Sequence, residues 1–202
     1  DANFERFEAS LEQVSLQSAA IGLEEEVLTI EQDWTEFKQL MNNNRADMMN
    51  VGYSNVRLVD DMGRNALALV NLISSSYTEL ASTSGMTPPA IVQQARNMAL
   101  LMEEITSQYA ARGTSVLGQV FVGVQKQTLT EMADKFQRDY LALKDMAKDK
   151  RSLVILDSIG SKWSFMERSI RNYNENSVPF LVVSYNDRIV GHLQELDDSY
   201  HK

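Results

Sequence analysis

The sequence has no cysteine, and only three prolines and nine glycines in 202 residues. Without cysteine there is no thiol catalysis, no thiolate metal site and no disulfide. Because Gly and Pro are the residues that most disfavour a helix interior, their scarcity indicates few, long elements. No run of about 18 apolar residues occurs, so no segment of this sequence is predicted to span a membrane. No secretory signal is recognisable either.

The charge balance is acidic, with 28 Asp and Glu against 19 Lys and Arg and a net charge of −9. Proteins that bind nucleic acid carry basic faces, so this balance argues against a nucleic-acid partner. Acidic and basic residues are mixed along the sequence, and no anionic patch is predicted. The hydrophobic content of 44% and the charged content of 23% permit a buried core. Helix-favouring residues dominate, and the predicted fold class is all-α.

Residues 23–82 carry the longest regular pattern of the sequence. Apolar residues and a few asparagines recur at alternating steps of three and four over more than six heptads, without an intervening proline. This heptad pattern predicts one continuous helix of roughly 60 residues, about 90 Å long at 1.5 Å per residue. Its seam positions are Val27, Ile30, Trp34, Phe37, Met41, Asn44, Met48, Val51, Asn55, Leu58, Met62, Asn65, Leu69 and Leu72.

The same periodicity predicts four further helices. The first covers residues 2–17 and ends in a turn at Gly22, and another follows the Thr87-Pro88-Pro89 restart to about residue 122. Thr128 and Glu131 have capping-box spacing and open a helix that ends in the polar turn 149–152. The last helix begins near Ser152, and Pro179 is expected to kink it rather than to end it.

Two segments of the sequence resemble each other at an offset of 129 positions. This offset relates Phe7 to Phe136 and Trp34 to Trp163, and the apolar positions between them also match. We therefore predict an elongated rod of two stacked helical-bundle modules sharing long helices, with module boundaries at 1–82 and 83–202. The first copy has no counterpart of residues 88–122, so either the sequence begins one helix into that module or the module is smaller.

The second module resembles a known family of sensor domains. The segment QQARNMALLMEEITSQYAARG (93–113) is similar to the Arg-bearing helix of PilJ-type modules, and it is followed, as in that family, by a hairpin helix (EMADKFQRDYLAL) and a Trp-bearing helix (DSIGSKWSFMERSI). The stretches WTEFKQLM and PPAIVQQ, with the long helix between them, resemble the passage from the first to the second PilJ module. The resemblance covers nearly the whole sequence in element order.

This resemblance implies the periplasmic sensory domain of a methyl-accepting chemotaxis transducer that controls type IV pili and twitching motility. It also implies an inner-membrane receptor with flanking transmembrane helices outside the sequence, a homodimer, and pilin subunits as a partner. Since residue 1 is Asp rather than Met, we expect a processed or excised piece of a longer protein. The competing interpretations are a bimodular receptor for a small anion such as nitrate or a carboxylate, and a structural or adaptor helical rod without a sensory role.

Arg96 is the candidate ligand or partner anchor, with Gln93 and Asn97 as accessory donors, because a guanidinium fork binds carboxylate or nitrate well. The alternative is that Arg96 is a surface arginine without a binding role, either solvated or paired with an acidic residue. The sequence departs from the family at the second basic residue of this helix, where Glu103 or Glu104 stands instead. That departure puts an anion-binding role in doubt.

Asn44, Asn55 and Asn65 occupy seam positions of the long helix and form a predicted polar seam. A buried Asn at such a position fixes register at a cost in stability, and a partly polar seam could shift register during signalling. The alternative is that the helix turns some of these side chains to solvent. Trp34 and Trp163 are interpreted as core residues rather than as a ligand cage.

No enzyme motif is present, and we expect no catalytic residues, no cofactor and no metal. Glu24, Glu25 and Glu26 suit the positive end of a helix dipole better than a metal cluster. His192 and His201 lie nine positions apart without an acidic partner pattern, which does not match a metal site.

Overall fold

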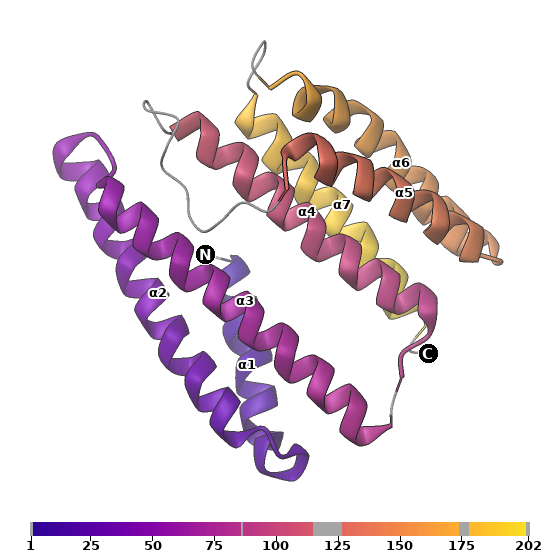
Figure 1. Ribbon diagram of the computed structural model, residues 1–202, viewed down its shortest axis with the longest axis horizontal. Helices are drawn as coiled ribbons and strands as arrows, with labels where there is room; N and C mark the ends of the chain where they lie inside the picture. The colour runs from indigo at the N-terminus through magenta and orange to yellow at the C-terminus, as the bar shows by residue number, and fades with distance from the viewer. Residues whose placement is uncertain (1, 86, 115–126, 174–177, 201–202) are drawn as a thin grey trace. The chain divides into compact units, whose positions relative to one another are not determined.

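A computed structural model describes residues 2–85, 87–114, 127–173 and 178–200, and these residues form seven α-helices and no strand (Figure 1). The predicted all-α class is therefore confirmed. The chain divides into two compact units, Asp1–Thr87 and Pro88–Lys202, which we call unit 1 and unit 2 and describe separately. The predicted rod stays a prediction. The expected continuation of a helix beyond residue 114 falls outside the described residues.

Unit 1 contains α1 (Ala2–Ile21), α2 (Glu24–Val51) and α3 (Val56–Ser84). The continuous helix predicted over residues 23–82 is wrong, because residues 52–55 form a turn and α3 folds back to pack along α2 (Figure 1). Gly52 ends α2 in the left-handed region (φ 88°) and donates its N–H to Met48 O at 3.1 Å. Asn55 then begins α3 as its N-cap, accepting a hydrogen bond from the Arg57 N–H at 3.0 Å.

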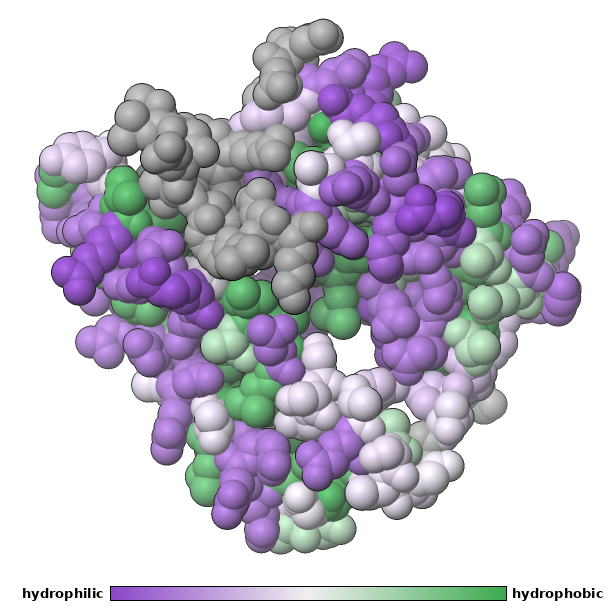
Figure 2. All heavy atoms as spheres, in the orientation of Figure 1, coloured by the Kyte–Doolittle hydropathy of each residue, from purple (hydrophilic) through white to green (hydrophobic). Residues whose placement is uncertain are grey.

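The core of unit 1 forms where α1, α2 and α3 meet. Ile30, Trp34 and Leu69 are buried there, and five partly buried side chains pack against them: Phe4, Phe7, Leu11, Phe37 and Leu72. The aromatic rings are in direct contact, with Trp34 4.8 Å from Phe4 and 4.5 Å from Phe7 between ring centroids. Hydrophobic side chains also remain at the surface over this part of the chain, as the green areas of Figure 2 show.

Unit 2 is a four-helix bundle made of α4 (Ala90–Thr114), α5 (Leu129–Met146), α6 (Lys150–Arg171) and α7 (Pro179–Ser199). α4 packs against α5 and α7, and α6 packs against the same two helices, so the four helices close a ring. Their inward side chains form one large core, in which Met98, Tyr109, Phe136, Leu156 and Trp163 are at most 1% exposed.

The helix ends of unit 2 follow from local sequence. The predicted capping box is confirmed: Thr128 Oγ1 accepts from the Glu131 N–H, and the Glu131 carboxylate accepts from the Thr128 N–H at 2.7 Å. The predicted Pro179 kink is wrong, because α6 ends at Arg171 and α7 packs alongside it as a separate helix. Pro179 lies in the first turn of α7, where its missing N–H removes no hydrogen bond from the helix.

The two units share a hairpin with the same internal contacts. In unit 1 the Trp34 indole N–H donates to Glu8 Oε1 at 3.1 Å, and in unit 2 the Trp163 indole N–H donates to Gln137 Oε1 at 2.8 Å. Donor and acceptor are 26 positions apart in both hairpins. The ring of Phe136 lies 4.2 Å from Trp163, as Phe7 lies 4.5 Å from Trp34. The α1–α2 and α5–α6 hairpins are therefore equivalent, which supports the sequence repeat.

Candidate functional site

Arg96 lies near the start of α4 and forms a two-point ion pair with Asp197 of α7. Its Nε donates to Asp197 Oδ2 at 2.7 Å and its Nη2 to Oδ1 at 3.2 Å. The side chains are only 34% and 19% exposed, so the pair is partly shielded from water. A planar fork on a carboxylate is the geometry predicted for an anion anchor, but the anion is a side chain of the same unit.

The predicted accessory donors Gln93 and Asn97 lie on α4 one turn apart. Gln93 Nε2 donates to Asn97 Oδ1 at 3.1 Å, and this contact is exposed to solvent. Asn97 is exposed, whereas Arg96 is half-buried. The three predicted residues thus lie in neighbouring turns of α4. Gln93 and Asn97 contact each other, whereas Arg96 binds Asp197 of α7.

Two further hydrogen bonds join α4 to α7. Asn186, which is 3% exposed, donates its Nδ2 to Glu103 Oε1 at 3.2 Å, and the Val178 N–H donates to the Tyr109 hydroxyl at 2.9 Å. With the Arg96–Asp197 pair, these contacts form a polar ladder along the length of the α4–α7 seam. The ladder was not predicted from sequence, because its partners lie 69 to 101 positions apart.

In the middle contact of this ladder, between Asn186 and Glu103, the charged form of the Glu103 carboxyl is disfavoured. Glu103 is exposed as a residue, but partial desolvation of its carboxyl raises the pKa; the hydrogen bond from Asn186 lowers this pKa, and the negative charge of Asp187 raises it. Within the described residues, the buried Oδ1 of Asn186 and Oγ1 of Thr106 lack a hydrogen-bond partner. The α4–α7 seam therefore contains a buried amide, that of Asn186, whose hydrogen-bonding capacity is only partly satisfied.

The predicted polar seam of Asn44, Asn55 and Asn65 does not lie on one helix. Asn55 is the N-cap of α3, whereas Asn44 and Asn65 are half-buried on α2 and α3, which pack against each other. Their Oδ1 atoms are buried and lack a partner among the described residues. A register shift of one continuous helix is therefore excluded as a role for these asparagines, and two of them remain as polar groups inside the α2–α3 pair.

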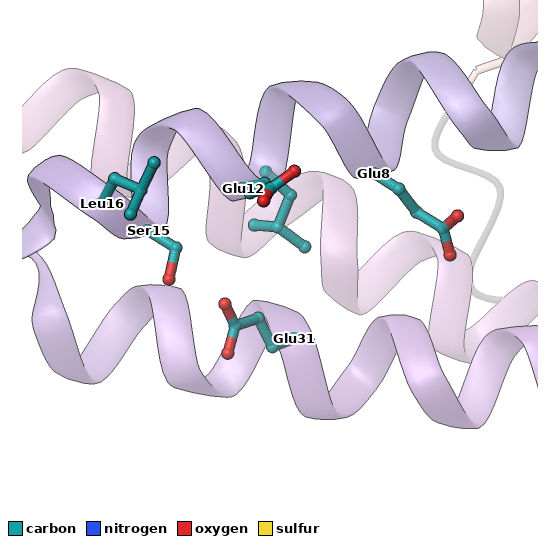
Figure 3. Close-up of a pocket in the computed structure, with 6 residues that line it drawn as sticks. Glu8, Glu12, Ser15, Leu16 and Glu31 are labelled. Atoms are coloured by element: carbon teal, nitrogen blue, oxygen red, sulfur yellow. The ribbon is translucent and has the colours of Figure 1, made fainter.

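The net negative charge of the chain lies in unit 1. Residues 1–87 contain 14 acidic and 5 basic residues, and residues 88–202 contain 14 of each, so the net charge of −9 divides into −9 and 0. The prediction that acidic and basic residues are well mixed along the sequence is therefore wrong for unit 1, where acidic residues predominate. A small depression of about 230 Å³ between α1 and α2 is lined by Glu8, Glu12 and Glu31 together with Leu11, Ser15 and Leu16 (Figure 3).

The carboxylates in this depression have different surroundings. Glu8 accepts hydrogen bonds from Trp34 and, at 2.5 Å, from Lys38 Nζ, and these contacts lower the pKa of its carboxyl. Figure 3 shows Glu12 on α1 and Glu31 on α2 at the rim of the depression. No group of His, Asp and Glu able to hold a metal ion occurs among the described residues.

The chain was compared with known proteins in three ways. No family model, no curated protein and no solved structure matches it. None of the described helices is long and apolar enough to cross a membrane. Functional inference therefore rests on the residues and contacts given above.

Proposed function

We propose that the chain is the periplasmic sensory domain of a methyl-accepting chemotaxis transducer that controls type IV pili and twitching motility. The observation that supports this proposal is the order and packing of the helices of unit 2. The Arg-bearing helix α4, the hairpin helix α5 and the Trp-bearing helix α6 follow one another as in PilJ-type modules, and α4 and α6 both pack against α5. The repetition of the hairpin in unit 1 agrees with a bimodular sensor.

In the proposed mechanism, the α4–α7 seam is the part that responds to a stimulus. A stimulus can shift a conformational balance only through its different affinities for the two states. The Arg96–Asp197 pair ties the start of α4 to the last turn of α7. A ligand or partner carboxylate that binds Arg96 in place of Asp197 would release this end of α7, and the change would pass along α7 toward a transmembrane helix beyond it.

The proposal includes an inner-membrane location, transmembrane helices on both sides of the chain, a homodimer, and pilin as the stimulus-bearing partner. The small-anion receptor is a weaker candidate, because the fork of Arg96 already holds Asp197 and the second basic residue of the family is replaced by Glu103 or Glu104. A purely structural helical rod remains the alternative outside sensing.

The sequence of the complete gene tests the proposed class. We expect a transmembrane helix on each side of the chain and, beyond the second one, a cytoplasmic coiled-coil signalling region. A complete gene without these elements would rule out a transducer. A pull-down with the purified chain tests the partner separately: retention of pilin supports it, and loss of retention in R96A would assign the contact to α4. Failure to retain pilin would contradict pilin as the partner but not the class.

A further inference from the structure

The described part of unit 1 contains no counterpart of the helix that closes the bundle in unit 2. The equivalent hairpins α1–α2 and α5–α6 are each followed by a helix that packs on the Trp-bearing helix, α3 in unit 1 and α7 in unit 2. In unit 2 the fourth place, in contact with α5 and α7, is taken by α4. Among the described residues of unit 1, no helix stands in the corresponding place in contact with α1 and α3.

Equivalent positions are less buried in unit 1. Leu143 of α5 is fully buried, whereas its counterpart Val14 of α1 is 42% exposed. Phe136 is fully buried, and its counterpart Phe7 is only half-buried. The same difference separates Met166 and Ile170 of α6, each 1% exposed, from the half-buried Phe37 and Met41 of α2. The interior of unit 1 thus uses equivalent positions, but its side chains are more exposed to solvent than those of unit 2.

Helix α3 carries a second apolar stripe beside the one that packs on α2. Its members recur at steps of four and three, and Val70 and Ile73 are 47% and 38% exposed. Each member follows a residue of the core stripe by one position, which turns it by about 100° around the helix. The stripe consists of Val59, Gly63, Ala66, Val70, Ile73 and Tyr77, of which all but Val70 and Ile73 are half-buried.

The same side of α7 shows what such a stripe contacts. Leu196 belongs to the core stripe of α7, and the next residue, Asp197, binds Arg96 of α4. Asp197 thus lies on the α4 side of α7, although Val183, which also follows the core stripe by one residue, is 40% exposed with α4 in place. By analogy, the second stripe of α3 borders the place that α4 fills in unit 2.

The composition of α3 indicates what kind of helix could pack on its second stripe. No charged residue occurs in α3 from Asn65 to Thr78, although unit 1 as a whole carries a net charge of −9. A partner for this surface needs an apolar face with uncharged polar edges, because charges there would be desolvated without a counter-ion. The first half of α4, AIVQQARNMALLM, has this character, with Arg96 as its single charged residue.

We propose that the surface formed by α1 and the second stripe of α3 receives an amphipathic helix of the α4 type, supplied by polypeptide that precedes α1. The source follows from the repeat, because α4 directly precedes α5 in the chain and α5 is the equivalent of α1. The bound helix completes a second four-helix bundle and seals Phe7, Phe37 and Met41. This inference does not depend on the proposed sensory function.

The test compares the 202-residue chain with the same protein extended at its N-terminus by its own preceding coding sequence, over a length equal to residues 88–128. Hydrogen exchange of the α3 amides is the readout. In the extended protein we expect exchange across residues 59–77 to slow about tenfold or more, as a newly packed helix face requires. Unchanged exchange, or a gene that encodes no helix there, overturns the proposal.

Matched variants locate the contact. Val70→Glu places a charge on the second stripe and is expected to lower the Tm of the extended protein while leaving the 202-residue chain nearly unchanged. Met49→Glu, at an 87% exposed position of α2 outside the stripe, is expected to change neither. An equal loss from V70E in both proteins contradicts a bound helix. Concentration-dependent protection of α3 in the 202-residue chain, with dimers in sedimentation, would instead assign the surface to a second copy.

Discussion

Arg96 and Asp197 lie 101 positions apart in the sequence, and their side chains form a bidentate ion pair between α4 and α7. Removing one partner leaves the other charge partly shielded from water without its counter-ion. We expect R96A to lower the free energy of unfolding of unit 2 by about 1–2 kcal/mol. R96K, which keeps the charge but loses the fork, should retain only part of this stability.

Trp163 gives a readout for that measurement. Since Trp34 is the other tryptophan of the sequence, the W34F variant emits from unit 2 alone, and its urea denaturation reports the unfolding of that unit. R64A is the control, because Arg64 lies in unit 1 and is 59% exposed on its side chain. A loss from R64A as large as that from R96A, in this fluorescence signal, would show that the ion pair is not the cause.

Occupation of Arg96 by Asp197 predicts how the chain responds to small anions. We expect nitrate and small carboxylates to leave the Tm of the wild-type chain unchanged at millimolar concentrations, and to raise the Tm of D197A, in which the Asp197 carboxylate no longer competes for the arginine fork. Thermal denaturation at constant ionic strength measures both. A saturable rise in the wild type that disappears in R96A would favour the small-anion receptor over the present proposal.

The raised pKa of Glu103 makes the stability of unit 2 depend on pH. Below about pH 4 the carboxyl is protonated in the folded and unfolded states alike, and it imposes no cost. As the pH rises through the ordinary value of 4.5 and then the raised folded-state pKa, the unfolded state loses its proton first and folding becomes less favourable. E103Q should therefore raise the Tm at pH 7 and leave it unchanged at pH 4.

The neighbour Glu104 supplies the control for this pH profile, since E104Q makes the same change of charge one residue further along α4, away from the contact of Glu103 with Asn186. Thermal unfolding of wild type, E103Q and E104Q across pH 4–8 would separate the two positions. Equal effects of E103Q and E104Q at every pH would attribute the change to net charge rather than to desolvation of the Glu103 carboxyl.

Two helical glycines of unit 2 predict opposite effects of the same substitution. A Cβ at Gly160 would lie 2.2 Å from the Tyr140 hydroxyl, which is held by a hydrogen bond to Leu156 O at 3.1 Å. At Gly191 a Cβ would meet nothing within 4 Å. We expect G191A to stabilise unit 2 by about 0.5–1 kcal/mol, through the better helix propensity of Ala, and G160A to destabilise it. Stabilisation by both variants in urea denaturation would show that Tyr140 moves aside freely.

The unequal closure of the two units predicts unequal costs at their equivalent tryptophans. Trp163 is 1% exposed in a sealed core, and Trp34 is 8% exposed beside half-buried Phe4 and Phe7. We expect W163A to cost about 3–5 kcal/mol in unit 2, as for large aromatic truncations in closed cores. W34A should cost unit 1 less. Site-resolved hydrogen exchange measures each unit separately, and a larger loss from W34A would contradict the open core of unit 1.

The sequence predicted the helical class, the capping box at Thr128 and the buried tryptophans, because these depend on local propensity and spacing. It also led to one wrong helix, since the seam from Val27 to Leu72 keeps its heptad period across the turn at 52–55. Gly52 and Asn55 carry the signal that corrects this error, as a left-handed helix end and an N-cap. Pro179 likewise belongs to a helix start rather than to a kink.

The site was less accessible to prediction than the fold. Arg96 could be selected from its helix, but its partner Asp197 could not, because nothing local links residues 101 positions apart. The acceptors of the two indole N–H groups were missed although a signal existed. Glu8 and Gln137 differ by the same 129 positions that relate Trp34 to Trp163, so the repeat offset applied to polar residues would have found them.

The most direct test of the proposed sensory role is the twitching motility of cells whose chromosomal gene lacks, in frame, the codons for residues 1–202. If the chain senses for the type IV pilus system, the shortened protein should accumulate at the membrane and the twitching zone should change and stop responding to surface contact. Reinsertion of the wild-type codons should restore both properties. Wild-type twitching in the deletion strain, with the shortened protein present at a normal level, would contradict the proposed function.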